Sequence, residues 1–360
     1  MRIAFFGSSL TSAYWNGAAT YYRGIIRALR QRGIDTTFYE PDAYERQAHR
    51  DIADPDWARV VVYPADSESR LNPLLEEAKT ADVIVKTSGI GVFDAYLEAV
   101  IPQTAGQNAI TIFWDVDAPA TLDRIGNNST DPFLKFIPQY DLILTYGGGE
   151  PVVRGYRKHG AQMCVPVYNA LDPETHYPIA PDSRFEADLG FLANRLPDRE
   201  SRVREFFFKA AQALPDHKFL FGGNGWQGET MPPNINYIGH VFTADHNGFN
   251  CTPRAVLNVS RESMAKYGFS PATRVFEAAG AGACLITDAW EGIELFLEPE
   301  REVLVARNGE EVAERLNALP ADRAKAIGLA ARRRVLQEHT YAKRAEQVEA
   351  VLEARTARTV

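Results

Sequence analysis

Two arginines lie just beyond a predicted strand in the second half of this 360-residue chain. Arg195 and Arg199 follow the apolar run 189–192, which is typical of a short buried strand. Paired guanidinium groups at a strand end are suited to bind a diphosphate, because each can donate two parallel hydrogen bonds to phosphate oxygens. An ordinary loop with its charges turned to water is the alternative, and this segment alone does not choose between the two.

An arginine and a glutamate lie three residues apart on a predicted short helix further along the chain. Pro271 suits the first turn of that helix and Ser270 suits its N-terminal cap. Helical spacing brings Arg274 and Glu277 within reach of each other, and the helix N-terminus can face an anion. The alternative is a surface ion pair, which would stabilise the helix by only ~0.5 kcal/mol.

A glycine-rich loop, residues 223–228, satisfies the spacing G-x-G-x-x-G directly after a predicted strand. A dinucleotide-binding turn requires a helix to begin at once, whereas two prolines follow here at 232–233, so we do not expect NAD binding. The glycines still allow a ligand to approach the backbone closely. The loop therefore offers Asn224, Gly225 and Trp226 as candidate ligand contacts, with a plain turn as the alternative.

Two carboxylates, Asp115 and Asp117, follow the predicted strand 110–113. Carboxylates at a strand end can hold a metal, act as a base or accept hydrogen bonds from sugar hydroxyls. One of them can instead cap the helix that follows. The spacing leaves these interpretations open.

The composition excludes several classes of protein. Lys plus Arg number 39 and Asp plus Glu number 47, and the net charge of −8 argues against a general binder of nucleic acids or membrane surfaces. The three cysteines form no C-x-x-C pair, the seven histidines form no H-E-x-x-H motif, and P-loop and G-x-S-x-G signatures are missing. No apolar run approaches the ~18 residues that cross a bilayer, and the first residues lack the apolar core of a signal peptide. A cytoplasmic protein without a membrane span is expected.

Short apolar runs alternate with helical patterns in both halves of the chain. Residues 3–6, 83–85 and 110–113 are such runs, and a stretch with helical spacing, 18–29, follows the first. This alternation predicts parallel sheets covered by helices on both faces. Segment 166–181 holds four prolines in sixteen residues, which indicates a linker between two similar α/β domains.

Four segments, taken in order, resemble the CgeB-like (spore-maturation type) glycosyltransferases of the GT-B fold, and the resemblance covers most of the chain. The segments are Asn16-Gly17-Ala18-Ala19-Thr20-Tyr21-Tyr22-Arg23-Gly24, then residues 140–149, then Thr273-Arg274-Val275-Phe276-Glu277-Ala278 with Gly282 and Ile286-Thr287-Asp288, and finally residues 339–345. The resemblance implies two Rossmann-like, doubly wound domains that face each other across a cleft. It implies an acceptor-binding domain at 1–168, a nucleotide-sugar-binding domain at 169–338, and a C-terminal helix at 339–360 that crosses back to the first domain.

The resemblance also implies roles for individual residues. Glu277 would accept hydrogen bonds from the donor ribose, the nearby arginines would contact the diphosphate, and the segment around His240 would hold the nucleobase. The donor-binding set is Arg195, Arg199, Asn224, Gly225, Trp226, Gly239, His240, Val241, Thr273, Arg274 and Glu277, and the acceptor- or sugar-binding set is Asn16 and Gly17.

Enzymes of this type generally need neither a metal nor a cofactor, because the nucleoside-diphosphate sugar is a co-substrate. Asp115 and Asp117 are then candidates for contact with a sugar or an acceptor rather than for a metal site. Many retaining relatives carry a Glu eight residues before the ribose-binding Glu, where this chain has Phe269, so the stereochemistry stays open. The acceptor can be a glycan, a protein or a small molecule. The rival functions are a nucleotide-sugar epimerase and a non-catalytic nucleotide-sugar-binding protein.

Overall fold

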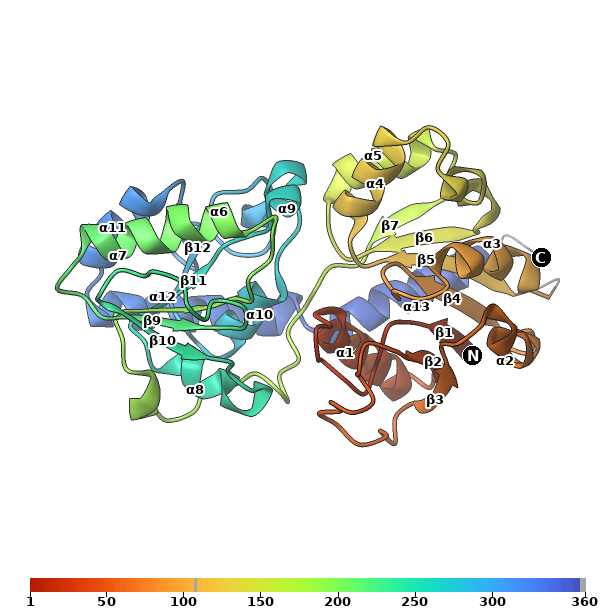
Figure 1. The fold of residues 1–360 in the computed structure, drawn as a ribbon, viewed down its shortest axis with the longest axis horizontal. Helices are drawn as coiled ribbons and strands as arrows, with labels where there is room; N and C mark the ends of the chain where they lie inside the picture. The colour runs from red at the N-terminus through yellow and green to blue at the C-terminus, as the bar shows by residue number, and fades with distance from the viewer. Residues whose placement is uncertain (107–108, 357–360) are drawn as a thin grey trace. The chain divides into compact units, whose positions relative to one another are not determined.

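The chain folds into two compact units, each built on its own sheet (Figure 1). The computed structural model describes residues 1–106 and 109–356. Unit 1 comprises Met1–Tyr168 and Tyr341–Val360, and unit 2 comprises Asn169–Thr340. Unit 1 is therefore assembled from two separate stretches of sequence, whereas unit 2 is continuous.

Unit 1 contains a seven-stranded parallel sheet with the strand order β3-β2-β1-β4-β5-β6-β7. The strands are β1 (Arg2–Phe6), β2 (Asp35–Asp42), β3 (Arg59–Pro64), β4 (Val83–Thr87), β5 (Ile110–Asp115), β6 (Leu142–Thr145) and β7 (Cys164–Pro166). The helices are α1 (Ala18–Gln31), α2 (Asn72–Ala78), α3 (Asp94–Thr104), α4 (Ala118–Asn127), α5 (Gly149–Lys158) and α13 (Tyr341–Thr356). Every residue of β4 and β5 is buried, as expected for central strands that helices cover on both faces.

Unit 2 contains a six-stranded parallel sheet with the order β10-β9-β8-β11-β12-β13. The strands are β8 (Leu189–Leu192), β9 (Phe219–Gly222), β10 (Ile235–Gly239), β11 (Ala255–Asn258), β12 (Leu285–Asp288) and β13 (Leu304–Ala306). The α-helices are α6 (Glu200–Val203), α7 (Lys209–Ala213), α8 (His246–Cys251), α9 (Glu262–Tyr267), α10 (Thr273–Gly280), α11 (Gly309–Asn317) and α12 (Ala321–Glu338), and a π-helical turn, Arg204–Phe208, joins α6 to α7. The two sheets follow the same pattern, in which the first strand of the unit lies beside its second and its fourth strand. The prediction of two Rossmann-like parallel-sheet domains is confirmed.

The core of unit 2 is rich in aromatic rings. Phe191 and Phe221 stack in parallel with their centroids 5.6 Å apart, and Phe207 packs against both. Trp226 joins this cluster with its ring centroid 5.2 Å from that of Phe221 and has no exposed surface. These contacts hold in place the beginnings of the loops that follow β8 and β9.

Helix α13 packs on α1 within unit 1. The two helices approach closely at Gly24, where a Cβ atom would lie 2.2 Å from the Tyr341 ring. Only glycine fits at this point of the helix pair. The last helix of the chain thereby becomes part of the first unit.

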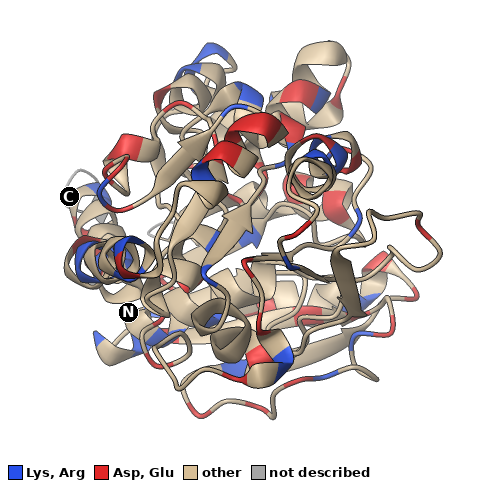
Figure 2. Ribbon diagram, turned by 90° about the vertical axis from the view of Figure 1, so that its left-hand side faces the viewer, with Lys and Arg blue, Asp and Glu red and all other residues tan. Residues whose placement is uncertain are grey.

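Charges of both signs are interspersed over the helices and loops (Figure 2). None of the helices in the part of the chain that the structure describes has an apolar stretch long enough to cross a bilayer.

Candidate functional site

Three loops of unit 2 are joined at the carboxyl edge of the sheet. The Asn194 side chain, after β8, accepts a hydrogen bond from the Asn224 backbone nitrogen, after β9, at 2.9 Å. The Arg195 backbone nitrogen donates to the Asn224 carbonyl at 2.8 Å. The Asn224 side-chain nitrogen in turn lies 3.2 Å from Nδ1 of His240, which follows β10. The structure therefore brings together residues that the sequence placed in three separate segments.

The loop after β9 approaches the loop after β8 so closely that it requires glycine. Gly223 has a φ of 130°, and a Cβ atom there would lie 2.1 Å from the Ala193 carbonyl oxygen. The fit explains the glycine-rich sequence by packing of backbone on backbone. Gly225, in the loop after β9, and Gly239, at the end of β10, also have positive φ values, 87° and 72°.

Arginine side chains gather near the switch point of this sheet, where β8 lies beside β11. Arg195 is held by the carboxylates of Glu200, at 2.7 Å, and Glu229, at 3.3 Å, and its guanidinium lies 5.2 Å from the Trp226 ring centre. Arg202 pairs with the buried Asp288 at 2.6 Å. Ligands of parallel sheets bind outside the strand ends at such a switch point.

Arg199 differs from these paired arginines. Its Nη2 donates to the Asn194 carbonyl, while its buried Nε has no hydrogen-bond partner among the residues that the structure describes. The pKa of Arg199 is lowered to about 10, mainly by burial; Asp198 opposes this effect, and the nearby Arg261 and Arg274 add to it. A half-buried cation with an unused donor is suited to bind an anion.

Arg274 and Glu277 form the expected pair on α10, with Nη1 3.3 Å from the carboxylate. The helix begins at Thr273, two residues later than Ser270 and Pro271 suggest, because Ala272 is extended and Ser270 bonds to the Gly268 carbonyl instead. Thr273 is half-buried in the first turn. Both members of the ion pair are largely buried, so the interpretation as a solvated surface pair is wrong.

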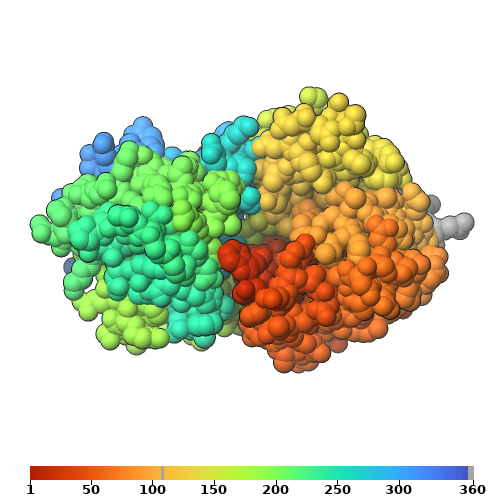
Figure 3. All heavy atoms as spheres, viewed as in Figure 1, coloured from red at the N-terminus to blue at the C-terminus, as the bar shows by residue number. Residues whose placement is uncertain are grey.

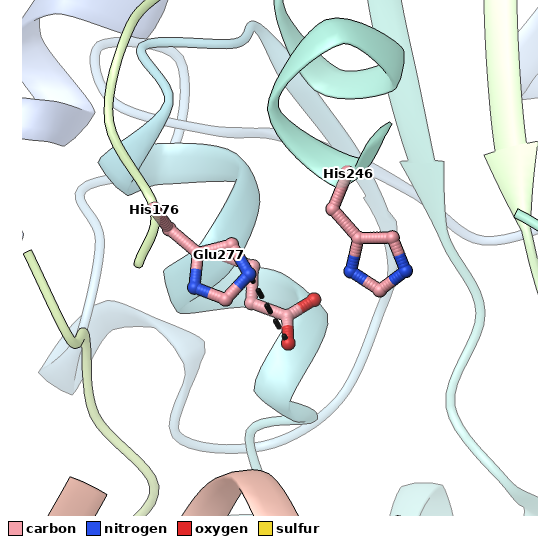
Figure 4. Close-up of side chains that lie close together, drawn as sticks. All are labelled: His176, His246 and Glu277. Atoms are coloured by element: carbon pink, nitrogen blue, oxygen red, sulfur yellow. Dashed lines mark ion pairs between the residues drawn. The ribbon is translucent and has the colours of Figure 1, made fainter. Parts of the chain in front are cut away.

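Two histidines from distant segments complete the surroundings of Glu277 (Figure 4). His176 approaches from the segment before β8, with Nε2 3.8 Å from the carboxylate, and His246 approaches from α8. Burial by itself would raise the pKa of Glu277, but Arg274, His176 and His246 together lower it to about 2. Burial, and next the charge of Arg274, lowers the pKa of His246 to about 4. Glu277 is thus a buried carboxylate that stays ionised at neutral pH, where His246 carries no charge.

The same three side chains are the residues that could hold a metal. Ligand atoms of His176, His246 and Glu277 all lie within 4.8 Å of one another. The guanidinium of Arg274 already balances the carboxylate and would repel a cation placed between the three. Hydrogen-bonding capacity is left over in the cluster, since His176 Nε2 and Arg274 Nε have no partner among the described residues. The arrangement suits a neutral, hydroxyl-bearing ligand better than a metal ion.

Two predicted donor contacts lie inside the protein. Trp226 is fully buried, and its Nε1 donates to the Ala193 carbonyl at 2.9 Å. Val241 packs in a second apolar cluster with Leu220 and Phe249. Both side chains are buried because they fill space beneath the loops that follow β9 and β10. Neither side chain is available to a ligand.

The two carboxylates of unit 1 lie in different surroundings. Asp115 is fully buried and accepts hydrogen bonds from the Ser88 hydroxyl at 2.6 Å, the Tyr156 hydroxyl at 2.5 Å and the Asp117 backbone nitrogen at 3.0 Å. These bonds satisfy the carboxylate and tie β5 to its neighbouring segments. Asp117 is half-buried at the N-terminus of α4 and does not cap that helix with its side chain. The structure gives Asp115 a structural role.

Asn16 and Gly17 precede α1. Asn16 is buried, and its side chain bonds to Ser8 Oγ and to the carbonyls of Ser9 and Ser12. It shapes the loop after β1. Gly17 is exposed, with open space where a Cβ would lie.

Sequence reasoning missed the two histidines and Asn250. The Asn250 side chain is buried beside Arg274, and its Oδ1 lies 3.4 Å from Arg274 Nη1. His176 and His246 lie 101 and 31 residues before Glu277, so no local spacing links them to it. Phe242, next to His240, is 66% exposed. Its ring adds an apolar surface beside the three loops that Asn224 joins.

Known protein families and solved structures share features of this architecture. A family model described as glycosyl transferase-like matches residues 199–350. No curated protein matches the chain. Among solved structures, sucrose-phosphate synthase from Thermosynechococcus elongatus has a TM-score of 0.73 at 14% identity, with 99% of each chain covered. HepE from Anabaena, in complex with UDP and glucose, has a TM-score of 0.68 at 13% identity, over 98% of this chain and 100% of that one. An alpha-glucosyltransferase in complex with UDP-glucose and DNA has a TM-score of 0.72 at 10% identity, over 98% and 99%.

The fold is therefore the GT-B fold of two-domain glycosyltransferases. The family match adds that most of unit 2 is similar to a glycosyl transferase-like domain.

Proposed function

We propose that this protein is a glycosyltransferase, which binds a nucleoside-diphosphate sugar at the carboxyl edge of the unit 2 sheet and transfers the sugar to an acceptor bound by unit 1. The observation that carries the assignment of the donor site is the group formed by the half-buried Arg199 and Arg274 and the buried Glu277, which combines unused cationic donors with an ionised carboxylate. The cationic donors suit a diphosphate, and the ionised carboxylate suits the two hydroxyls of a ribose.

In this proposal each group has one task. Arg199 and Arg274 donate to the diphosphate and stabilise the negative charge that develops on it as the sugar leaves. Glu277 accepts hydrogen bonds from the ribose hydroxyls, and its low pKa keeps it an acceptor at neutral pH. The loops joined through Asn224 and His240 hold the nucleobase, with the exposed ring of Phe242 available for stacking.

UDP is the first nucleotide to test, because HepE and the alpha-glucosyltransferase were each solved in complex with UDP or its glucose conjugate. We further propose that no metal or other cofactor takes part. The support is the pairing of Glu277 with Arg274, which supplies internally the positive charge that a cation would bring.

The CgeB-like subtype is part of the same proposal. It is supported by the Thr273-Arg274-Val275-Phe276-Glu277-Ala278 segment, in which Arg274 and Glu277 are the residues that meet in the candidate site. The segment thus supports both the resemblance to the CgeB-like family and the proposed donor site.

Thermal unfolding in the presence of nucleoside diphosphates and their sugars tests the donor site. A ligand at roughly 100 times its Kd adds about 2.7 kcal/mol of stability. We expect one diphosphate to raise the melting temperature of the wild type, and Glu277→Gln to abolish the shift. Glu298→Gln is the matched control, because Glu298 forms an ion pair with Arg301 at the same sequence spacing but on the surface. A shift that survives in Glu277→Gln, or no shift with any compound, would overturn the proposal.

Turnover of the stabilising donor then separates transfer from other reactions. We expect sugar release to water or to an added acceptor. An isomerised nucleotide sugar formed without acceptor would instead identify an epimerase.

A further inference from the structure

A hollow in the surface of unit 1 has features that neither the fold nor the donor site explains. It has a volume of about 430 Å³ and is lined by Trp15, Tyr44, Glu45, Arg46 and Gly91. Its size falls within the range of pockets that bind small molecules. Its residues come from the segments that follow β1, β2 and β4. The start of unit 1, coloured red to orange, lies at the surface in Figure 3.

The hollow lies where ligands of parallel sheets bind. In the unit 1 sheet β1 pairs with both β2 and β4, so the chain reverses its direction of strand addition between β1 and β4. The segments after β1 and β4 therefore flank the topological switch point. Trp15 belongs to the first segment and Gly91 to the second.

Two aromatic side chains of the hollow are exposed instead of buried. The exposed fraction is 57% for Trp15 and 54% for Tyr44. The Tyr44 ring is fixed in place, because its hydroxyl donates to the Gly91 carbonyl at 2.7 Å and the Arg46 guanidinium lies 5.0 Å from its centre. A fixed, exposed ring offers a flat apolar surface without the entropy loss of ordering it on binding.

Backbone conformation at the hollow is unfavourable. The described part of the chain has six non-glycine residues with positive φ, and Trp15, Tyr44 and Glu45 are three of them, with φ values of 48°, 57° and 57°. Bulky residues avoid this conformation. Strain of this kind gathers at ligand-binding positions, and here it holds large rings in water.

Polar groups complement the rings. Arg46 is only 7% exposed, its Nη1 donates to the Ser8 carbonyl at 3.2 Å, and its Nε has no partner among the described residues. Glu45 is exposed next to it. The hollow thus offers an apolar platform and a carboxylate acceptor, with the Arg46 guanidinium in its lining.

We infer that this hollow binds a sugar ring of the acceptor, so that the acceptor is a carbohydrate. A pyranose has one face of C–H groups that packs on an aromatic ring and a rim of hydroxyls that bonds to carboxylate and guanidinium groups. A nucleic acid acceptor fits less well, because the chain carries a net charge of −8. The inference deepens the proposed function and rests on it, since it identifies the class of acceptor.

An array of printed oligosaccharides, probed with fluorescently labelled protein, tests the inference. We expect the wild type to bind a restricted set of glycans. Trp15→Ala should weaken binding to them about tenfold, the scale of one aromatic contact, while Trp15→Phe, which keeps a flat ring, should stay within about threefold. Leu295→Ala is the control, because it removes a comparably exposed apolar side chain from unit 2 and should change nothing.

The stabilisation by UDP, measured on the same variants, separates this inference from the proposed function. It should be equal in the wild type and Trp15→Ala. Binding of no glycan, or equal glycan binding by the wild type and Trp15→Ala, would overturn the inference while leaving the donor site standing. Glycan binding that depends on Trp15 without stabilisation by any nucleoside diphosphate would instead overturn the donor proposal and leave a carbohydrate site.

Discussion

The two units share one pattern of strand order but carry different chemistry at the carboxyl edges of their sheets. In unit 2 the edge holds arginines and an ionised, buried Glu277 with hydrogen-bonding capacity left over. In unit 1 the buried Asp115 already accepts three hydrogen bonds, and the hollow exposes the aromatic rings of Trp15 and Tyr44 beside the Glu45 carboxylate. The strand order determines where loops converge, and the residues of those loops determine what can bind there. A charged donor would require the arginine-rich edge of unit 2, and a neutral sugar acceptor would require the aromatic surface of unit 1.

Removal of Arg274 should have the largest effect on unit 2. Arg274→Ala leaves the buried Glu277 without its guanidinium partner, which should cost about 3 kcal/mol of stability and abolish stabilisation by UDP. Chemical denaturation and melting with UDP measure the two effects. Arg301→Ala breaks an exposed pair at the same spacing and should stay within about 0.5 kcal/mol of the wild type. An equal response of the two variants would mean that the buried pair has no special role.

Acidification should act on unit 2 before unit 1. The pKa of His246 is lowered to about 4, mainly by burial, from an ordinary value of 6.5. Because the pKa is lower in the folded state, the stability that neutral His246 contributes is fully present above pH 6.5 and is lost as the pH falls toward 4. The loss is about 3 kcal/mol at most. Glu277, with its pKa lowered from 4.5 to about 2, adds a second loss only below about pH 4.5.

Amide hydrogen exchange as a function of pH can localise this loss. We expect α8 and α10 to lose protection between pH 6.5 and 4 while β4 and β5 keep theirs. His246→Gln should flatten the response, and His49→Gln, a substitution of an exposed histidine in unit 1, should leave it intact. Parallel loss of protection in both units would contradict the assignment to His246.

Asp115→Ala should reveal a structural carboxylate in unit 1. The substitution leaves the buried hydroxyls of Ser88 and Tyr156 without their acceptor, which should destabilise the protein by about 2 kcal/mol. Stabilisation by UDP should be unchanged. Asp66→Ala, at an exposed ion pair, is the control for loss of a carboxylate. A variant with normal stability but no transfer would instead restore Asp115 as a catalytic residue.

Chelation should have the smallest effect. We expect EDTA to leave both UDP binding and transfer unchanged, since Arg274 already balances Glu277. Melting curves with EDTA, and with Zn²⁺ added back, provide the measurement. Loss of UDP binding in EDTA and its recovery with Zn²⁺ would show that His176, His246 and Glu277 bind a metal.

The parts of the fold that follow from local sequence were predictable. Continuous apolar runs gave β4 and β5, and helical spacing gave α1. The edge strands β7 and β13 were missed, because a run of only three residues is too short to form a pattern. The beginning of α10 was misplaced because Ser270, a good capping residue, bonds to a loop carbonyl instead.

The candidate site was predictable only where its residues are close in sequence. Arg274 and Glu277 meet because three residues separate them on a helix, whereas His176 reaches the same carboxylate through tertiary structure alone. Burial was the second quantity that sequence could not supply. Trp226 in a glycine-rich loop and Asp115 after a strand have the residue types of a ligand site, yet both side chains lie in the interior.

The position of α13 has a consequence for the synthesis of the protein. Unit 2 is continuous in sequence, whereas unit 1 needs α13, which is translated after all of unit 2. Because domains fold as their residues emerge from the ribosome, unit 2 can complete its fold first. Until α13 has been translated, the surface of α1 around Gly24, which Tyr341 later covers, stays open. The nascent chain therefore exposes an apolar helix face for at least the time that the roughly 170 residues of unit 2 take to be translated, and chaperones have that interval in which to bind it.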